Sequence, residues 1–156
     1  MNILDRLSAL FSEPHAPEIK PLPPTDVPHA LGALLVRVAK SDDRYAVEEI
    51  SLIDRVLATY QEIGPIEAAK LRAECERLEA FAPDTPEFAI YLSRSVSYED
   101  RQNMVQALWQ VVYADGRVRD VEASVMNITQ SHLGISAEDC TAARARAQHV
   151  TDLSNS

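Results

Sequence analysis

Apolar positions recur at intervals of three and four residues through most of the chain, which is the spacing that places side chains on one face of an α-helix. No run alternates apolar and polar residues as a half-buried strand would. The pattern therefore predicts an all-α fold. The predicted helices cover about 29–40, 46–62, 66–80, 86–93, 97–113, 118–133 and 136–150.

Residues that commonly flank helices support these limits. Gly64 is expected to end the second helix and Pro65 to start the third, because glycine suits a C-terminal cap and proline a first turn. Ser97, with Asp100 three residues later, has the spacing of an N-terminal capping pair. Gly134 is expected to end the sixth helix.

The same spacing predicts which side chains face the core. Trp109 falls in register with neighbouring apolar residues and is expected to be buried. In the sixth helix, 118–133, one stripe of residues is expected to point inward. Its members are Val121, Val125, Ile128 and Thr129.

The chain divides into a short N-terminal segment, a linker and one domain. Residues 1–11 carry apolar residues on one face and are predicted to form a short amphipathic helix. Residues 12–28 hold six of the nine prolines, so they are predicted to form an extended linker. The helical domain is expected to span 29–150, and the tail, 151–156, to fray.

An acidic turn occurs twice between apolar helical segments. The second copy reads ADGRVRDVE at 114–122, and the first reads SDDRYAVEE at 41–49. An offset of 73 residues, from 42 to 115, superimposes the acidic positions and the flanking apolar residues. The aligned pairs are Asp42 with Asp115 and Glu49 with Glu122. This predicts a duplicated helix–acidic turn–helix unit.

The two turns offer carboxylates to a cation. If the turns lie side by side, they gather the several oxygen ligands that Ca²⁺ and Mg²⁺ require. Gly116 permits a positive φ angle in the second turn, and Asp43 takes that place in the first. One interpretation of the two acidic turns is therefore a divalent-cation site. Its candidate ligands are Asp42, Glu49, Asp115 and Glu122, with Asp43, Glu48 and Asp120 as further candidates.

Other interpretations of the acidic turns stay open. An aspartate before a helix is a common N-cap, and a glutamate in the first turns favours the helix dipole. Arg44 and Arg117 can also neutralise the acids. The chain would then be a purely structural protein–protein interaction module. A metal-assisted hydrolase is less favoured, because no histidine supports the acidic positions.

Composition narrows the class of protein. The chain has 156 residues and a net charge of −9, which suits one domain and disfavours nucleic acid as a partner. Cys75 and Cys140 lack the spacing of a metal site, which favours two free thiols. The sequence shows no membrane-spanning run and no signal peptide, so we expect a cytoplasmic protein.

Residues 1–11 are the sequence feature that most suggests a partner. An apolar-faced helix on a tether can pack on its own domain, pair with a second copy of the chain, or dock in a groove of another protein. We therefore expect a protein partner or self-association. Arg6 is balanced by Asp5, so attraction of this segment to anionic membranes would be weak.

Together these motifs resemble the TerB-like family, the helical domains related to the bacterial tellurite-resistance protein TerB. The resemblance rests on ADGRVRDVE, the apolar stretch ALWQVVY before it and the weaker copy SDDRYAVEE, and it covers about 31–147. Asp43 and Ser41 depart from the glycine and alanine that are usual there. The resemblance implies a compact bundle of about seven helices without enzymatic activity, linked to tellurite-resistance-like stress response. It also implies metal binding at Asp42, Glu49, Asp115 and Glu122.

Overall fold

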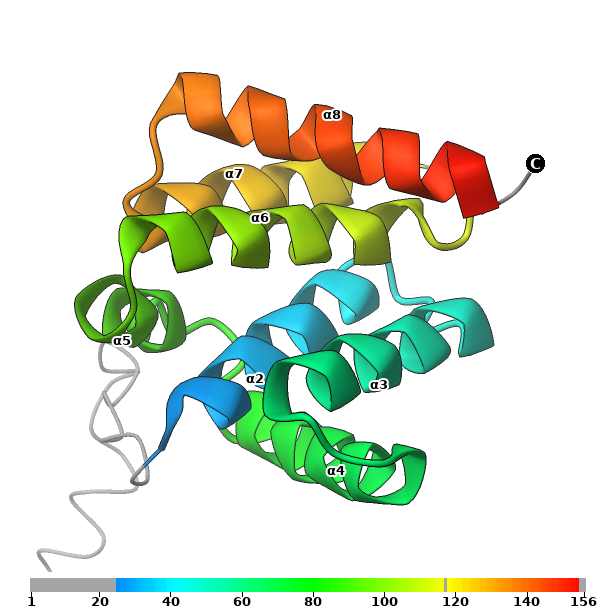
Figure 1. The fold of residues 1–156 in the computed structure, drawn as a ribbon. Coiled ribbons are helices and arrows are strands. Elements are labelled where there is room, and N and C mark those ends of the chain that lie inside the picture. Colours follow the sequence, from blue (N-terminus) through cyan, green and yellow to red (C-terminus); the bar gives the residue numbers. More distant parts are fainter. Residues whose placement is uncertain (1–24, 117, 155–156) are drawn as a thin grey trace, which may run out of the picture.

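A computed structural model describes residues 25–116 and 118–154 and folds them into seven α-helices without a strand (Figure 1). This confirms the predicted all-α fold. Within these residues, no helix is long and apolar enough to cross a bilayer. The predicted amphipathic segment 1–11 and most of the predicted linker 12–28 lie outside the described residues. The helices are α2 (Val27–Lys40), α3 (Val47–Gln61), α4 (Pro65–Phe81), α5 (Glu87–Ser95), α6 (Tyr98–Tyr113), α7 (Asp120–Leu133) and α8 (Ala137–Ser154).

Helix α2 is the centre of the bundle. It packs against α3, α4, α5, α6 and α7, whereas α8 packs on α6 at the far side (Figure 1). Nine of its fourteen residues are buried, so α2 is apolar on nearly all sides, as a central helix must be. Trp109, on α6, is also buried, as predicted.

Helices α2 and α4 approach each other closely at one glycine. A Cβ atom added to Gly32 would lie 2.1 Å from the Sγ atom of Cys75, which is fully buried on α4. Glycine is therefore required by space rather than by backbone conformation at this crossing. Cys75 and Cys140 both carry free thiols, as expected.

Two helix ends differ from the prediction. Helix α2 begins at Val27, because the Asp26 carboxylate accepts the backbone N–H of His29 and caps the helix. The last two residues of the predicted linker therefore belong to the helix. At the end of α3, the C-terminal cap is Glu62 rather than Gly64, and it takes the left-handed conformation with φ of 52°. Gly64 instead precedes Pro65 as the N-cap of α4.

Other helix ends are as predicted or extend further. The Ser97 hydroxyl accepts the N–H of Asp100 at 3.1 Å, and Gly134 ends α7 with φ of 71°. Helix α8 continues to Ser154 through most of the tail that was expected to fray. The Thr151 hydroxyl helps to hold this last part, because it donates to the Ala147 carbonyl at 2.9 Å.

The orientation of α7 corrects the predicted core. Val125 is half-buried and Thr129 is buried, but Val121 is 45% exposed and Ile128 is 59% exposed. The helix is rotated so that a face carrying Glu122 and Met126 points inward. The prediction for Val121 and Ile128 was wrong, because it followed the apolar residues and left the buried glutamate out.

Replacing Gly32 by alanine is expected to lower the free energy of unfolding by about 1–3 kcal/mol, because the added methyl group overlaps the Cys75 sulfur. Urea denaturation at equilibrium measures the change. In a Cys75→Ala background part of this loss should disappear, because the obstructing sulfur is gone while the Cβ atom of residue 75, 2.9 Å from the added methyl group, remains. An equal loss in both backgrounds would contradict the close approach.

Candidate functional site

The two acidic turns meet although they lie far apart in the sequence. One joins α2 to α3 and the other joins α6 to α7, and both lie on the right-hand side of the molecule in Figure 1. The Arg119 guanidinium donates from Nη1 to Oδ2 of Asp42, which links the second turn to the first. The Asp42 side chain is only 2% exposed, so the carboxylate of this ion pair is shielded from water, whereas the Arg119 side chain is 28% exposed.

The turns share their local backbone conformation. Asp43 has φ of 63° and Gly116, at the aligned position, has φ of 81°. The prediction that Asp43 takes the place of the glycine is therefore confirmed. In the first turn, Oδ1 of Asp42 also accepts the N–H of Arg44 at 3.0 Å, which fixes the orientation of the carboxylate. Duplication of the whole helix–turn–helix unit stays a prediction.

Two glutamates occupy the same position in the helices that follow the turns. Glu49 and Glu122 are each the third residue of their helix, and each accepts the backbone N–H of the N-cap residue. The distances are 3.1 Å from Ala46 and 3.4 Å from Arg119. Both glutamates are only 1% exposed. They therefore cap helices, but inside the protein rather than at its surface.

The aspartates do not have the capping role considered above. Because the N-caps of α3 and α7 are Ala46 and Arg119, neither Asp42 nor Asp115 is an N-cap. They lie four residues before the N-cap in both turns.

The charges of Asp42 and Asp115 act on both buried glutamates. Burial, with the charges of Asp42, Asp115 and Glu122, raises the pKa of Glu49 from 4.5 to about 7 against the hydrogen bond from Ala46. Burial, with the charges of Asp42 and Asp115, likewise raises the pKa of Glu122 to about 7 against the hydrogen bond and charge of Arg119. We name this set of Asp42, Glu49, Asp115 and Glu122 the carboxylate cluster.

The remaining acidic candidates lie at its edge. Asp43, Glu48 and Asp120 are exposed to solvent, and none of them is among the charges that raise the two glutamate pKa values. Within residues 25–116 and 118–154, no three His, Cys, Asp or Glu side chains are arranged as ligands of one metal ion. In this arrangement Asp42 is bonded to Arg119, and the glutamates are bonded to backbone N–H groups.

Sequence reasoning missed the arginine that enters the cluster. Of the two arginines considered above, Arg44 is exposed, and Arg117 lies outside the described residues. Arg119 instead carries the ion pair. It aligns with Ala46 in the first copy, so the repeat itself gave no signal for it.

Comparison with known proteins decides the family. Residues 29–145 match the family described as Tellurite resistance protein TerB. The chain belongs to the TerB family. This match covers most of the chain and agrees with the resemblance seen in the two turns. Neither the curated proteins nor the solved structures gave a match.

Glu122→Gln is expected to raise the free energy of unfolding of this TerB-family protein by about 1–2 kcal/mol at pH 8 in chelator. Glutamine can still accept the Arg119 N–H, so the cap is kept while a buried charge is removed. The folded state holds protons that the unfolded state releases between pH 4.5 and 7, so the glutamates destabilise the fold increasingly as the pH rises.

The gain should therefore vanish near pH 4, where both states hold the proton. Urea denaturation at several pH values measures it. The matched control is Glu138→Gln, which changes an exposed glutamate in the first turn of α8. A loss of stability in Glu122→Gln at pH 8 would contradict the raised pKa.

Proposed function

We propose that this TerB-family chain is a non-enzymatic module that binds a divalent cation at the carboxylate cluster, in a tellurite-resistance-like stress response. The proposal rests on one observation: Glu49 and Glu122 are both buried, and the negative charges of Asp42 and Asp115 raise the pKa of each. Mg²⁺ and Ca²⁺ are the expected ions, because both prefer carboxylate oxygens.

The electrostatics of the cluster favour a cation. A buried carboxylate destabilises the fold unless it is paired or protonated, and the charges of Asp42 and Asp115 add to this effect at Glu49 and Glu122. A divalent ion would neutralise two charges at once. Because ligands must be deprotonated, binding would release protons from the glutamates, and affinity would rise with pH through 7.

Binding requires a local rearrangement. Asp42 would have to exchange its ion pair with Arg119 for a bond to the ion. Arg119 is the N-cap of α7 and its side chain is 28% exposed, so the guanidinium has a route outward to solvent. The four carboxylates provide the negative charge that a cation site needs. Their oxygens would take up a ligand arrangement once the ion replaced Arg119.

Calorimetric titration of the chelator-stripped protein tests the proposal. Mg²⁺ or Ca²⁺ is expected to give saturable heat at pH 7.5 and weaker binding at pH 6. The expected heat disappears in Asp115→Ala/Glu122→Ala, and the control Glu138→Gln keeps it. Circular dichroism establishes that each variant is folded. No heat from a folded wild-type protein with either ion would overturn the proposal.

Arg119→Gln is expected to strengthen ion binding about tenfold, since a competing cation is removed from Asp42. Arg55→Gln, an exposed change on α3, is the matched control and should leave affinity unchanged. Titration of both variants with the same ion measures the difference. Weaker binding in a folded Arg119→Gln protein would show that the guanidinium supports the site rather than competes for it.

A protein-interaction module is the second candidate. The two glutamates already have a structural role as helix caps, and α7 presents Val121 and Ile128 to solvent. Exposed apolar side chains along a helix favour contact with another protein. The two candidates differ in the calorimetric experiment, because this one predicts no heat with any ion.

A further inference from the structure

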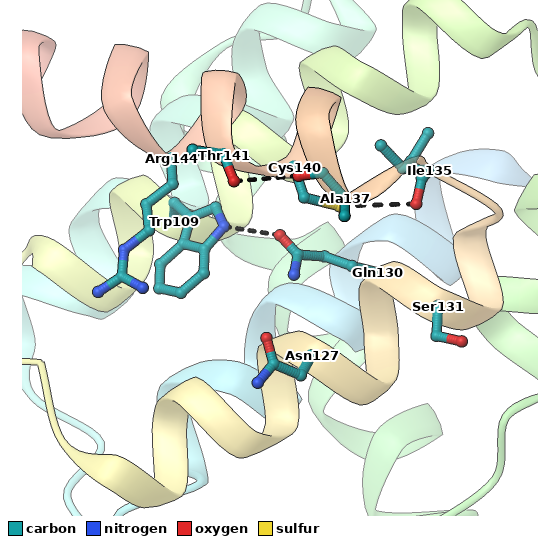
Figure 2. A pocket seen from close by; sticks show the side chains of 9 residues that line it. All are labelled: Trp109, Asn127, Gln130, Ser131, Ile135, Ala137, Cys140, Thr141 and Arg144. Atoms are coloured by element: carbon teal, nitrogen blue, oxygen red, sulfur yellow. Dashed lines mark hydrogen bonds between the residues drawn. The ribbon is translucent and has the colours of Figure 1, made fainter.

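A second site candidate lies near the C-terminal end of α7, between α7 and α8. A hollow of about 390 Å³ opens there over the side of α6 (Figure 2). Its lining contains one arginine and no aspartate or glutamate, in a chain whose net charge is −9. This local excess of positive charge sets it apart from the carboxylate cluster. The lining residues that matter here are Trp109, Asn127, Gln130, Ile135, Cys140 and Arg144.

A buried amide supplies one free donor to the hollow. Gln130 is 7% exposed, and its Oε1 accepts the indole N–H of Trp109 at 2.8 Å (Figure 2). An indole N–H only donates, so the oxygen of the amide must face Trp109 and the NH₂ group must face away from it. Among the described residues, none bonds to this Nε2 group. A donor is thus held in place beside the hollow without a protein acceptor.

The guanidinium of Arg144 is also held in place beside the hollow. Its guanidinium carbon lies 4.2 Å from the centre of the Trp109 ring, and its Nε donates to the Tyr113 hydroxyl at 2.9 Å. These contacts fix the guanidinium plane. No carboxylate in the described part of the chain pairs with Arg144, so its two terminal nitrogens keep their donors for another group.

The other walls of the hollow are suited to contact with an apolar group rather than to a chemical reaction. Ile135 is buried, and the indole and Ala137 extend the apolar wall. Burial, with the charge of Asp139, raises the pKa of the Cys140 thiol. The thiol also donates to the Ile135 carbonyl at 3.7 Å, and both effects favour the neutral thiol over the thiolate.

From this geometry we infer that the hollow binds the carboxylate of a small organic acid. The terminal nitrogens of Arg144 form a planar fork that matches two carboxylate oxygens, and a single positive charge balances a single negative one. The Gln130 Nε2 group and the exposed amide of Asn127 provide further donors on the α7 side (Figure 2). The apolar wall accommodates the carbon skeleton, so an aromatic acid should bind more tightly than acetate.

The fluorescence of Trp109 tests the inference, because this is the only tryptophan in the chain. Benzoate, acetate and sulfate are titrated against the full-length protein at constant ionic strength. Benzoate is expected to give a saturable change in the millimolar range, with acetate weaker and sulfate weaker still. No saturable change with benzoate, or binding of sulfate as tight as that of benzoate, would overturn the inference.

Variants distinguish benzoate binding in the hollow from quenching of the Trp109 fluorescence by collision with free benzoate. Arg144→Gln should weaken benzoate binding at least tenfold, as expected for loss of a charge-assisted hydrogen-bond pair. Asn127→Asp, an exposed and nearly isosteric change, should weaken it by adding a negative charge. Arg146→Gln is the matched control, because Arg146 lies outside the hollow on the same helix and bonds to Gln106.

The two contradicting outcomes are distinct. An unchanged benzoate response in folded Arg144→Gln would show that the guanidinium does not hold the ligand. Equal weakening in Arg146→Gln would show a general effect of positive charge rather than a site. Both results would overturn the inference, and neither bears on the carboxylate cluster, whose test uses metal ions and other residues.

Discussion

Glu49 and Glu122 are buried in the first turns of their helices, and this burial of like charges is the constraint on which the rest of the structure depends. A first-turn glutamate is ordinarily a surface residue that favours the helix dipole by a few tenths of a kcal/mol. Here each one is almost fully removed from water, and Asp42 and Asp115 add to the negative field. The backbone N–H groups, Arg119 and bound protons offset the cost.

The inward position of Glu122 has consequences along the whole of α7. It sets the rotation of the helix, so that Met126 and Leu133 join the core while Val121 and Ile128 face solvent. The same rotation brings Gln130 against Trp109, eight residues and about 12 Å farther along the helix. One helix thus borders the carboxylate cluster at its start and the hollow over Trp109 near its end.

Much of the fold could be predicted from the sequence. Periodicity located seven helices, and the duplicated motif identified Asp43 as the residue that adopts the positive φ angle of Gly116. Periodicity could not orient α7, because a method that follows apolar residues assigns Val121 to the core and an acid to the surface. The left-handed conformation of Glu62 was not predicted, because glycine is the usual residue at the end of a helix and Gly64 lies only two positions later.

The candidate site was only partly foreseeable. The aligned acids were visible in the sequence, and they proved to share one electrostatic environment, but Arg119 has no counterpart in the first copy. The hollow over Trp109 had no sequence signal at all. It arises from residues on three helices, and its free donors are evident only from which partners their neighbours already use.

The most direct test of the central claim is a ¹³C NMR titration of the Glu49 and Glu122 side-chain carboxyl groups, with and without saturating Mg²⁺ or Ca²⁺. The account predicts that both glutamates titrate near pH 7 in the ion-free protein and well below that pH when an ion is bound. Titration of both near pH 4.5, unchanged by either ion, would contradict it.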